Sequence, residues 1–492
     1  MRDYKFGDFI CERRKAVSLS QFQLGRLVGV SDKAVSKWEN GTSKPKSSLL
    51  PKIAEELNVS IDELLNCKLK EKISSKEDNL SQNEIWEKAQ SRLEELYGEN
   101  APLRVVSRLK AEKEKLEKTF LPLSYAIIGD IVSASQKEGY DVNCIGAMGN
   151  SFLAYLLGAV SLNPLKPHYL CPRCKKAHFM LTYKSAWDLP RRTCDCGADM
   201  ERLGHDMPLE TINSEIRSNY AECKVAQSMM PKVIEILKDF AENTSVVCML
   251  PDTSSTIPSN PYRFFFDPGH KGELRTVEYS EEQIYNLLPR HRLIVQPTSD
   301  IDKLHDLYVK TGTSPSEIEL NEELFNEFLR LDFKGIRAFD NDVSKEMISK
   351  CKPRTFYGLA QILGFGMGTG TWFDVASHLI EEEIPLSELI AFRDDVFVKV
   401  ADAMSSQGIY DGYDFAYEVM NDARRGFYSI KGMSKKTEES LKELPLPNWF
   451  FPSLFKFCYL IPKCTVFYRL KMAIAYMWFK KNYPEDFKKI AL

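Results

Sequence analysis

Two close pairs of cysteines carry the clearest chemical signal in the sequence. Cys171 and Cys174 form a C-x-x-C pair, and Cys194 and Cys196 form a C-x-C pair further along the chain. Thiolates this close converge on one tetrahedral soft cation, and Zn–S bonds can hold together a small segment that has too little apolar surface to fold alone. We therefore expect a structural zinc ribbon within residues 168–208. The alternative is a ribbon that has lost its metal, because the second pair is one residue shorter than usual.

Composition describes an ordinary soluble protein of several domains. The chain has 492 residues, of which 43% are hydrophobic and 27% charged, so we expect two to four domains. The apolar run over 450–479 is interrupted by prolines and charged residues, and no N-terminal signal pattern appears, so no membrane span is expected. Twelve cysteines without a secretory signal indicate a reducing, cytoplasmic location and favour metal binding over disulfides.

The net charge of −3 conceals an asymmetry between the two ends of the chain. Residues 1–70 carry 13 Lys and Arg against 9 Asp and Glu, whereas the remainder carries 53 against 60. A basic N-terminal segment ahead of a mildly acidic body places the first nucleic-acid footprint in the head.

Residues 5–66 predict a small domain of five short helices. The segments 20–28 and 31–41 read as helix, turn, helix, with Gly29 supplying the positive φ that such a turn needs. Ser31 is a suitable N-cap for the second of these helices, and Val35 and Trp38 are expected to point inward.

This head resembles the Cro/repressor (XRE) helix-turn-helix family, through V-S-x-x-x-V-S-K-W-E-N-G and a downstream L-N-V-S-x-D-E-L-L. The resemblance implies a DNA-binding domain over 1–67, with residues 31–37 as the recognition helix in the major groove. Such heads usually bind paired half-sites as dimers, so a homodimer on duplex DNA is an expectation; the alternative is a head that contacts only protein. Lys33 and Lys37 lie four residues apart, on one helical face, and are expected to contact phosphate or guanine edges. The side chains expected to face DNA are Gln21, Ser31, Lys33, Ser36 and Lys37.

Residues 68–82 are charged, contain serines and have few apolar side chains, so we predict a linker that lets the head move relative to the body.

The rest of the chain resembles the PolC-type DNA polymerase III α subunit. The resemblance rests on N-P-L-K-P-H-Y from Asn163, the adjoining C-P-x-C, and G-H-D-M-P-L-E-T from Gly204. It implies a mainly α protein with an α+β centre. A palm remnant of the polymerase β type would cover 83–312, with the zinc ribbon at 168–208 inserted in it, and helical fingers would cover 313–492.

The catalytic carboxylates of that family are expected to be missing here. In the family a Pro-Asp-x-Asp strand follows the ribbon and carries two metal-binding carboxylates. Here Glu210 and Thr211 run into residues 212–218 without an Asp-x-Asp, and the position of the third aspartate falls on Ile294. Polymerases need two metals bridged by carboxylates for phosphoryl transfer. We therefore expect no catalytic residues and no bound magnesium.

The family's phosphate-binding loop is also altered. Gly146 and Gly149 remain, whereas the arginine position is Ile145 and two serine positions are Ala147 and Asn150. The backbone turn is kept, and most of the phosphate-binding chemistry is lost.

Basic residues in the fingers region could still contact a triphosphate or a template backbone. The alternative for them is ion pairing with Asp394 and Asp395. The candidates are Arg393, Arg424, Arg425 and Lys463.

Three hypotheses follow. The first is a helix-turn-helix regulator whose catalytically inactive, polymerase-like body binds primer-template DNA, a nucleotide or a replisome protein. The second is an active minimal DNA polymerase, and the third is a scaffold that binds replisome proteins with little affinity for DNA.

Overall fold

The fold was analysed in a computed structural model, which divides the chain into two compact units. One unit holds the N-terminal residues to Asn83, and the other holds the described residues from Glu84 onward. Each unit is considered by itself. The described residues are 4–16, 19–46, 49–57, 59, 64–65, 67, 76–117, 119, 121–209, 221–241, 247–250, 262–266, 274–277, 293–409 and 413–492.

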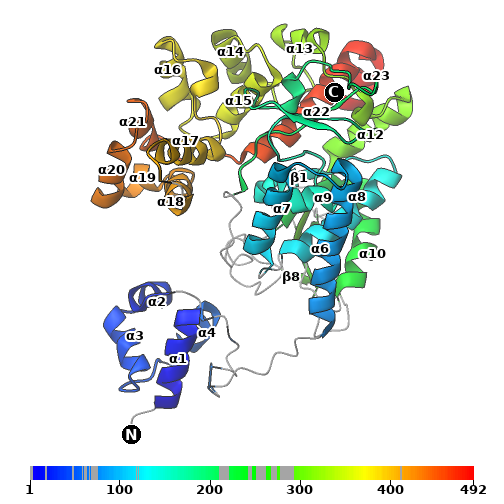
Figure 1. Cartoon of the computed structure of the whole chain (residues 1–492). Helices are drawn as coiled ribbons and strands as arrows, with labels where there is room; N and C mark the ends of the chain where they lie inside the picture. Colours follow the sequence, from blue (N-terminus) through cyan, green and yellow to red (C-terminus); the bar gives the residue numbers. More distant parts are fainter. Residues whose placement is uncertain are drawn as a thin grey trace. The chain divides into compact units, whose positions relative to one another are not determined.

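The head is a small helical domain, as the sequence predicts (Figure 1). Ser20 and Ser31 cap two of its helices with their side-chain oxygens, and Gly29 between these helices has φ 80°. A Cβ on Gly25 would lie 2.9 Å from the Val30 carbonyl oxygen, so glycine lets the chain pass closely here. The described helices are α1 (Tyr4–Ala16), α2 (Gln21–Val28), α3 (Asp32–Glu39) and α4 (Leu50–Glu56). Most of the predicted fifth helix lies outside the described residues.

The head has its own apolar core, because one face of each helix is apolar. Trp38 is 4% exposed, and Val35 on the same helix is fully buried, as the sequence predicts. The side chains that complete this core come from all four helices and include Phe9, Ile10, Leu24, Ile53 and Leu57.

The body begins earlier than the sequence predicts. Helix α6 (Lys76–Tyr97) starts inside the predicted linker, so the linker prediction over 68–82 is wrong for its second half. The apolar positions from Ile85 to Tyr97 recur at helical spacing, and this buried stripe stabilises a helix that continues back through the polar residues. Helices α7 (Leu103–Leu116) and α8 (Leu121–Lys137) follow.

A six-stranded sheet forms the centre of the body, in the order β1-β5-β9-β6-β7-β8. Strand β5 pairs parallel with β9 and antiparallel with β1, and β9 pairs parallel with β6. Cys223 and Val225 on β5 are fully buried on the face where α8 packs. The strands are β1 (Asn143–Ile145), β5 (Ala221–Ala226), β6 (Val247–Leu250), β7 (Tyr262–Phe266), β8 (Leu274–Val277) and β9 (Leu293–Thr298); α10 (Met230–Ala241) also packs against α8.

A separate three-stranded antiparallel sheet carries the cysteine pairs. Its order is β3-β2-β4, with β2 spanning His168–Leu170, β3 spanning Ala177–Phe179 and β4 spanning Glu201–Leu203. The ribbon has a small apolar cluster of its own around Tyr169, Leu189 and Met200.

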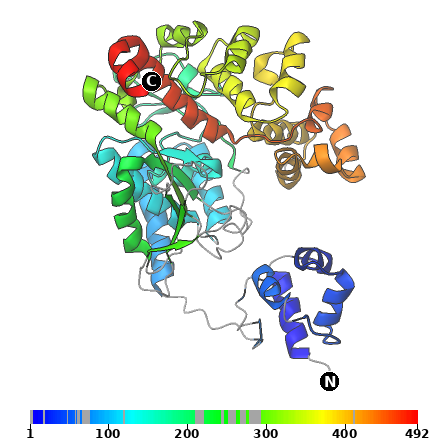
Figure 2. The ribbon, with the colours of Figure 1, turned by 180° about the vertical axis from the view of Figure 1, so that it is seen from behind.

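The second half of the body is helical. The 20-residue helix α22 (Lys463–Asn482) packs against both α15 and β1, so it connects this half to the central sheet (Figures 1 and 2). Together with the sheets, this confirms the predicted mainly α fold with an α+β centre. The longer helices here are α12 (Ser299–Thr311), α13 (Glu322–Leu329), α14 (Asp342–Cys351), α15 (Phe356–Met367), α17 (Arg393–Ser406), α18 (Tyr413–Ala423), α20 (Lys435–Lys442) and α23 (Pro484–Ala491). The shorter ones are α16 (Ser377–Glu381), α19 (Phe427–Lys431) and α21 (Phe450–Leu454).

Among the described residues, no helix is both long enough and apolar enough to cross a membrane.

Candidate functional sites

The recognition helix presents two lysines to solvent. Lys33 and Lys37 are exposed on α3, while Ser36 between them is half-buried. The hydroxyl of Ser31 accepts a hydrogen bond from the backbone N–H of Ala34 (3.3 Å) and so fixes the start of the helix. Two exposed ammonium groups on one helical face suit the phosphate backbone or guanine edges of duplex DNA.

Gln21 lies in a buried polar network. Its amide Nε2 donates to Glu39 Oε2 (2.8 Å), and the same carboxylate accepts two hydrogen bonds from the guanidinium of Arg14 (2.5 and 3.0 Å). Burial raises the pKa of Glu39, but the hydrogen bonds from Arg14 and Gln21 outweigh this effect and leave the pKa below its usual value. The network joins α1, α2 and α3, so Gln21 holds the helix-turn-helix together.

The four cysteine sulfurs converge on one point. All four Sγ atoms lie within 4.8 Å of one another, with Cys171 3.4 Å from Cys196 and Cys174 3.5 Å from Cys194. Tetrahedral zinc with Zn–S bonds of about 2.3 Å holds its sulfurs roughly 3.8 Å apart, so the donor set fits a metal ion of this kind.

Backbone turns explain how the shortened pair still reaches the others. Lys175 after the first pair (φ 61°) and Gly197 after the second (φ 82°) are both in the left-handed region. The N–H of Cys171 donates to the carbonyl of Lys176 (2.9 Å), and the N–H of Cys194 donates to the carbonyl of Ala198 (2.8 Å). Each pair therefore lies on a tight turn, and the tighter C-x-C spacing does not separate the thiols.

Buried polar groups attach the ribbon to the body. Burial lowers the pKa of His168 to about 4, and its ring contacts Tyr97 Oη (2.9 Å). Burial also lowers the pKa of His205 to about 3, where the ring hydrogen-bonds with the Ser185 hydroxyl (3.0 Å). Asp188 accepts hydrogen bonds from the first two N–H groups of α15 (2.7 and 3.1 Å), which anchors the ribbon to the helical half.

The strand pairing of the central sheet locates the palm positions that the sequence left open. Glu222 on β5 lies opposite residue 294 on β9, and Lys224 lies opposite Gln296. Because β5 follows the ribbon and pairs with the strand that carries position 294, β5 stands where the family has its Asp-x-Asp strand. Paired residues face the same side of a sheet, as do residues two apart on one strand.

This register corrects one expectation from the sequence. The first carboxylate position is occupied, because Glu222 stands there, 8% exposed, and accepts a hydrogen bond from Gln296 Nε2. The second position is Lys224, and the third is the aliphatic Ile294. A pair of magnesium ions does not fit one carboxylate, one ammonium group and one hydrocarbon side chain.

The altered phosphate loop folds as a short 3-10 turn, Gly146–Asn150, followed by α9 (Phe152–Leu156). Gly146 has φ 71°, and its N–H donates to Thr465 Oγ1 on α22 (3.0 Å). Gly149 is buried. The turn that the two glycines predict is therefore present.

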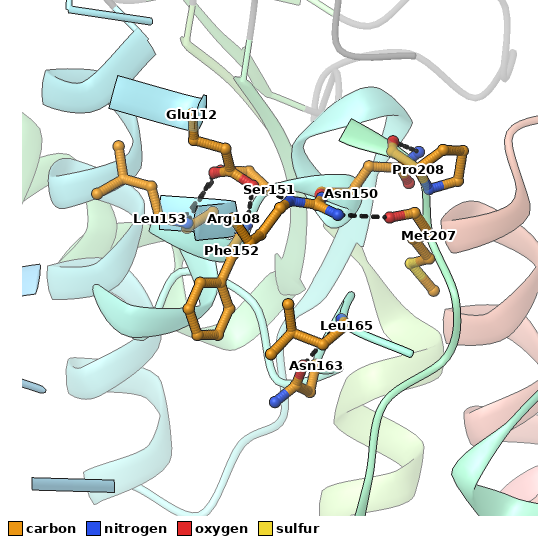
Figure 3. A network of polar contacts seen from close by, with 11 residues as sticks. Arg108, Glu112, Asn150, Ser151, Phe152, Leu153, Asn163, Leu165, Met207 and Pro208 are labelled. Carbon is orange, nitrogen blue, oxygen red and sulfur yellow. Dashed lines mark hydrogen bonds and ion pairs between the residues drawn. The ribbon is translucent and has the colours of Figure 1, made fainter. Parts of the chain in front are cut away.

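A buried carboxylate binds the start of α9 (Figure 3). Glu112 is fully buried and accepts hydrogen bonds from the N–H groups of Phe152 (2.7 Å) and Leu153 (2.9 Å). It also accepts from the Ser151 hydroxyl (2.7 Å) and from Arg108 Nε (2.8 Å). The donors at this helix N-terminus are thus engaged by a side chain of the protein itself.

Arg108 and Asn150 extend this network to the ribbon and the fingers region (Figure 3). Arg108 donates to the carbonyls of Asn150 and Met207, the latter at 3.1 Å. Asn150 Nδ2 lies 3.3 Å from the Pro208 carbonyl and 2.7 Å from Asp394 Oδ1. The loop, the end of the ribbon and α17 are therefore held in one polar cluster.

Two of the basic residues named for phosphate contact lie inside this region. Lys463 Nζ donates to the Asp206 carbonyl (3.0 Å) and lies over the Tyr357 ring (5.1 Å to its centroid); burial lowers its pKa. Arg393 is 6% exposed, and its Nε lies 3.9 Å from Asp394 Oδ2. This placement agrees with the alternative of buried partners for the carboxylates of α17.

The other two candidates lie nearer the surface. Arg424 is half-buried and donates to Asn421 Oδ1 (3.1 Å), and Arg425 is exposed beside the Phe427 ring. Neither arginine is placed with Arg393 and Lys463 by a described contact.

Comparison with known proteins defines the class of the two parts. Residues 12–64 match the helix-turn-helix family model, and residues 83–226, which end with β5, match the model of the bacterial DNA polymerase III alpha NTPase domain. The chain therefore carries a helix-turn-helix domain at its N-terminus, followed by a region related to DNA polymerase III alpha.

Curated relatives extend this match over most of the body. The chain is 25% identical over 479 residues to "DNA polymerase III PolC-type" of Staphylococcus aureus strains MW2 and USA300. The match covers 82% of this chain and 32% of each relative, so the chain spans about a third of their length.

Sequence reasoning missed three residues of these sites. Glu222 and Lys224 lack a local motif, and only their pairing with β9 reveals their position. Glu112 lies in an ordinary amphipathic helix and is distinguished only by its contacts with the start of α9.

Proposed function

We propose that the chain is a DNA-binding regulator whose polymerase-like body binds a replication-related ligand without joining nucleotides. The observation that carries the proposal is the ammonium group of Lys224 in the strand position of a metal-binding carboxylate. A cation at this place repels the magnesium ions that phosphoryl transfer needs.

The head supplies sequence-dependent binding to duplex DNA in this proposal. Lys33 and Lys37 are exposed on the recognition helix and contact phosphates or guanine edges, aided by Ser31, Ser36 and Gln21. A homodimer on paired half-sites in the bacterial cytoplasm is the corresponding assembly.

The body supplies ligand binding. The retained turn Gly146–Asn150 and the basic residues Arg424 and Arg425 favour primer-template DNA or a nucleotide, and a replisome protein is the third candidate. Zinc on the four cysteines would hold the ribbon, which borders the turn through Met207 and Pro208.

Retention on duplex DNA tests the role of the head. The full chain should be retained in a salt-dependent manner, and Lys33→Glu combined with Lys37→Glu should abolish retention. Lys488→Glu with Lys489→Glu reverses two charges on exposed residues of the body and is the matched control. Unchanged retention of the head variant would move the DNA footprint to the body, and absence of retention by the unaltered chain would favour the replisome scaffold.

Mapping the chromosomal sites that the protein occupies tests its regulatory role. Occupancy of discrete sites related by a shared sequence supports a regulator. Occupancy that follows replication forks, and that survives the head variant, would contradict it.

A further inference from the structure

We propose that Lys224 and Arg469 form a cation site that binds the phosphate groups of a ligand directly, without a divalent metal. The inference rests on the proposed function, in which the body binds a phosphate-bearing ligand, and it assigns the residues and the metal independence of that binding.

The sheet register places Lys224 on the open side of β5. The side chains of Cys223 and Val225 on the same strand are fully buried on the opposite side, against the helical layer. Lys224 is half-buried and lies between Asn143 on β1 and Gln296 on β9, so these three residues form one row across the sheet.

Helix α22 brings Arg469 to this row. Thr465 on α22 accepts the hydrogen bond from the Gly146 N–H, and Met472 accepts one from Asn143 Nδ2. Arg469 lies four residues after Thr465 and three before Met472, and therefore on the same helical face. Because Asn143 and Lys224 face the same side of the sheet, this helical face also borders Lys224.

The positive charge of Arg469 acts on Lys224. Burial lowers the pKa of Lys224 first, and the nearby guanidinium of Arg469 lowers it further. Arg469 is exposed at the border of the site. Two cations held close together repel each other, and an anion bound between them removes that cost.

The carboxylates closest to these cations already have partners. Glu222 accepts from Gln296, and Asp300 is paired with Arg337 at 2.9 Å. Within the described part of the chain, neither Lys224 nor Arg469 makes an ion pair or a side-chain hydrogen bond of its own. The site therefore carries an excess of positive charge beside the turn Gly146–Asn150.

A phosphate chain from a nucleoside triphosphate or from a DNA backbone has the complementary charge. In a two-metal site, carboxylates bind magnesium, and magnesium binds the phosphates. Here the side-chain cations would contact the phosphates themselves, so magnesium is unnecessary and would compete with them for the triphosphate.

Binding of a fluorescent deoxynucleoside triphosphate and of inorganic tripolyphosphate to the full chain tests the inference. Affinity in EDTA should equal or exceed affinity in magnesium. Lys224→Glu and, separately, the exposed Arg469→Glu should each weaken binding roughly tenfold or more. Lys488→Glu should leave affinity unchanged, and circular dichroism should show that each variant is folded. A primer-template lacking the operator, tested with a chain carrying Lys33→Glu and Lys37→Glu, reports binding to a DNA backbone by the body alone.

Each other outcome overturns the inference. Binding that requires magnesium, or that survives both charge reversals, would show that the body binds its ligand elsewhere or through metal, and would leave the proposed regulator intact. Absence of binding to triphosphate, tripolyphosphate and primer-template alike would reject the cation site and also the phosphate-bearing ligand, leaving a replisome protein as the ligand of the body.

Discussion

Lys224 follows Glu222 by two residues on β5, so an ammonium group and a carboxylate face the same side of the central sheet. Position 294 on β9 lies opposite the carboxylate and supplies only a hydrocarbon side chain. The charge that a polymerase palm concentrates in three carboxylates is reduced here to one, and a positive charge stands beside it.

Restoring carboxylates should restore metal binding. Lys224→Asp combined with Ile294→Asp places three acidic groups on this face, so manganese affinity should rise at least tenfold above that of the unaltered chain. Electron paramagnetic resonance of titrated Mn²⁺ measures this affinity. Lys488→Asp is the charge-matched control, and tight manganese binding by the unaltered chain would refute the assignment of β5.

The cysteine cluster should contain one zinc ion per chain. Elemental analysis of protein purified without added metal should find zinc, and Cys171→Ser should remove it, because three thiolates and a hydroxyl bind zinc much less tightly. Melting temperature should fall by roughly 5 °C or more. Cys458→Ser changes an exposed cysteine outside the cluster and should alter neither value. A metal-free native protein with unchanged stability would rule out a structural zinc.

Buried His205 should make stability depend on pH. Burial lowers the pKa of this imidazole to about 3 in the folded state, with the charge of Lys463 adding to the effect. Below the unfolded-state pKa of about 6.5, only the unfolded chain takes up the proton, so stability is lost as pH falls from there toward 3. Lowering pH from 7 to 5 should cost the native protein about 2 kcal/mol more than it costs His205→Gln.

Urea unfolding of both proteins at each pH measures that difference. Asp188 and Asp395, whose pKa values burial raises to about 6, contribute with the opposite sign, and their contribution cancels between the two proteins. Equal pH dependence of the native protein and the variant would contradict the assignment.

The carboxylate of Glu112 should stabilise the body through the start of α9. Glu112→Gln keeps the shape but replaces an acceptor of charge-assisted hydrogen bonds, so the free energy of unfolding should fall by roughly 2–4 kcal/mol. Glu114→Gln on the same helix is exposed and should change it by less than about 0.5 kcal/mol. Equal effects of the two changes in denaturant titrations would mean that the network in Figure 3 contributes little.

The features that the sequence predicts are those whose cause is local. Gly29 and Ser31 determine a turn and a cap within a few residues, and the two cysteine pairs lie on short turns, so their structure follows from spacing. The mainly α fold was predicted for the same reason, since helices show in the 3.6-residue period.

The palm residues depend instead on long-range pairing. Glu222 and residue 294 are neighbours only because β5 and β9 pair across a long stretch of chain, and A-E-C-K contains no sign of that partnership. The start of α6 at Lys76 was missed because polar residues there are helical only by continuation from the apolar stripe that begins at Ile85.

Primer extension tests the central claim most directly. With all four deoxynucleoside triphosphates, magnesium or manganese, and enzyme in excess over a labelled primer-template, a body without a metal pair should leave the primer unextended over hours. Extension that disappears in Glu222→Ala would show that the remaining carboxylate supports catalysis, and would contradict the account of a body that binds nucleic acid ligands without joining nucleotides.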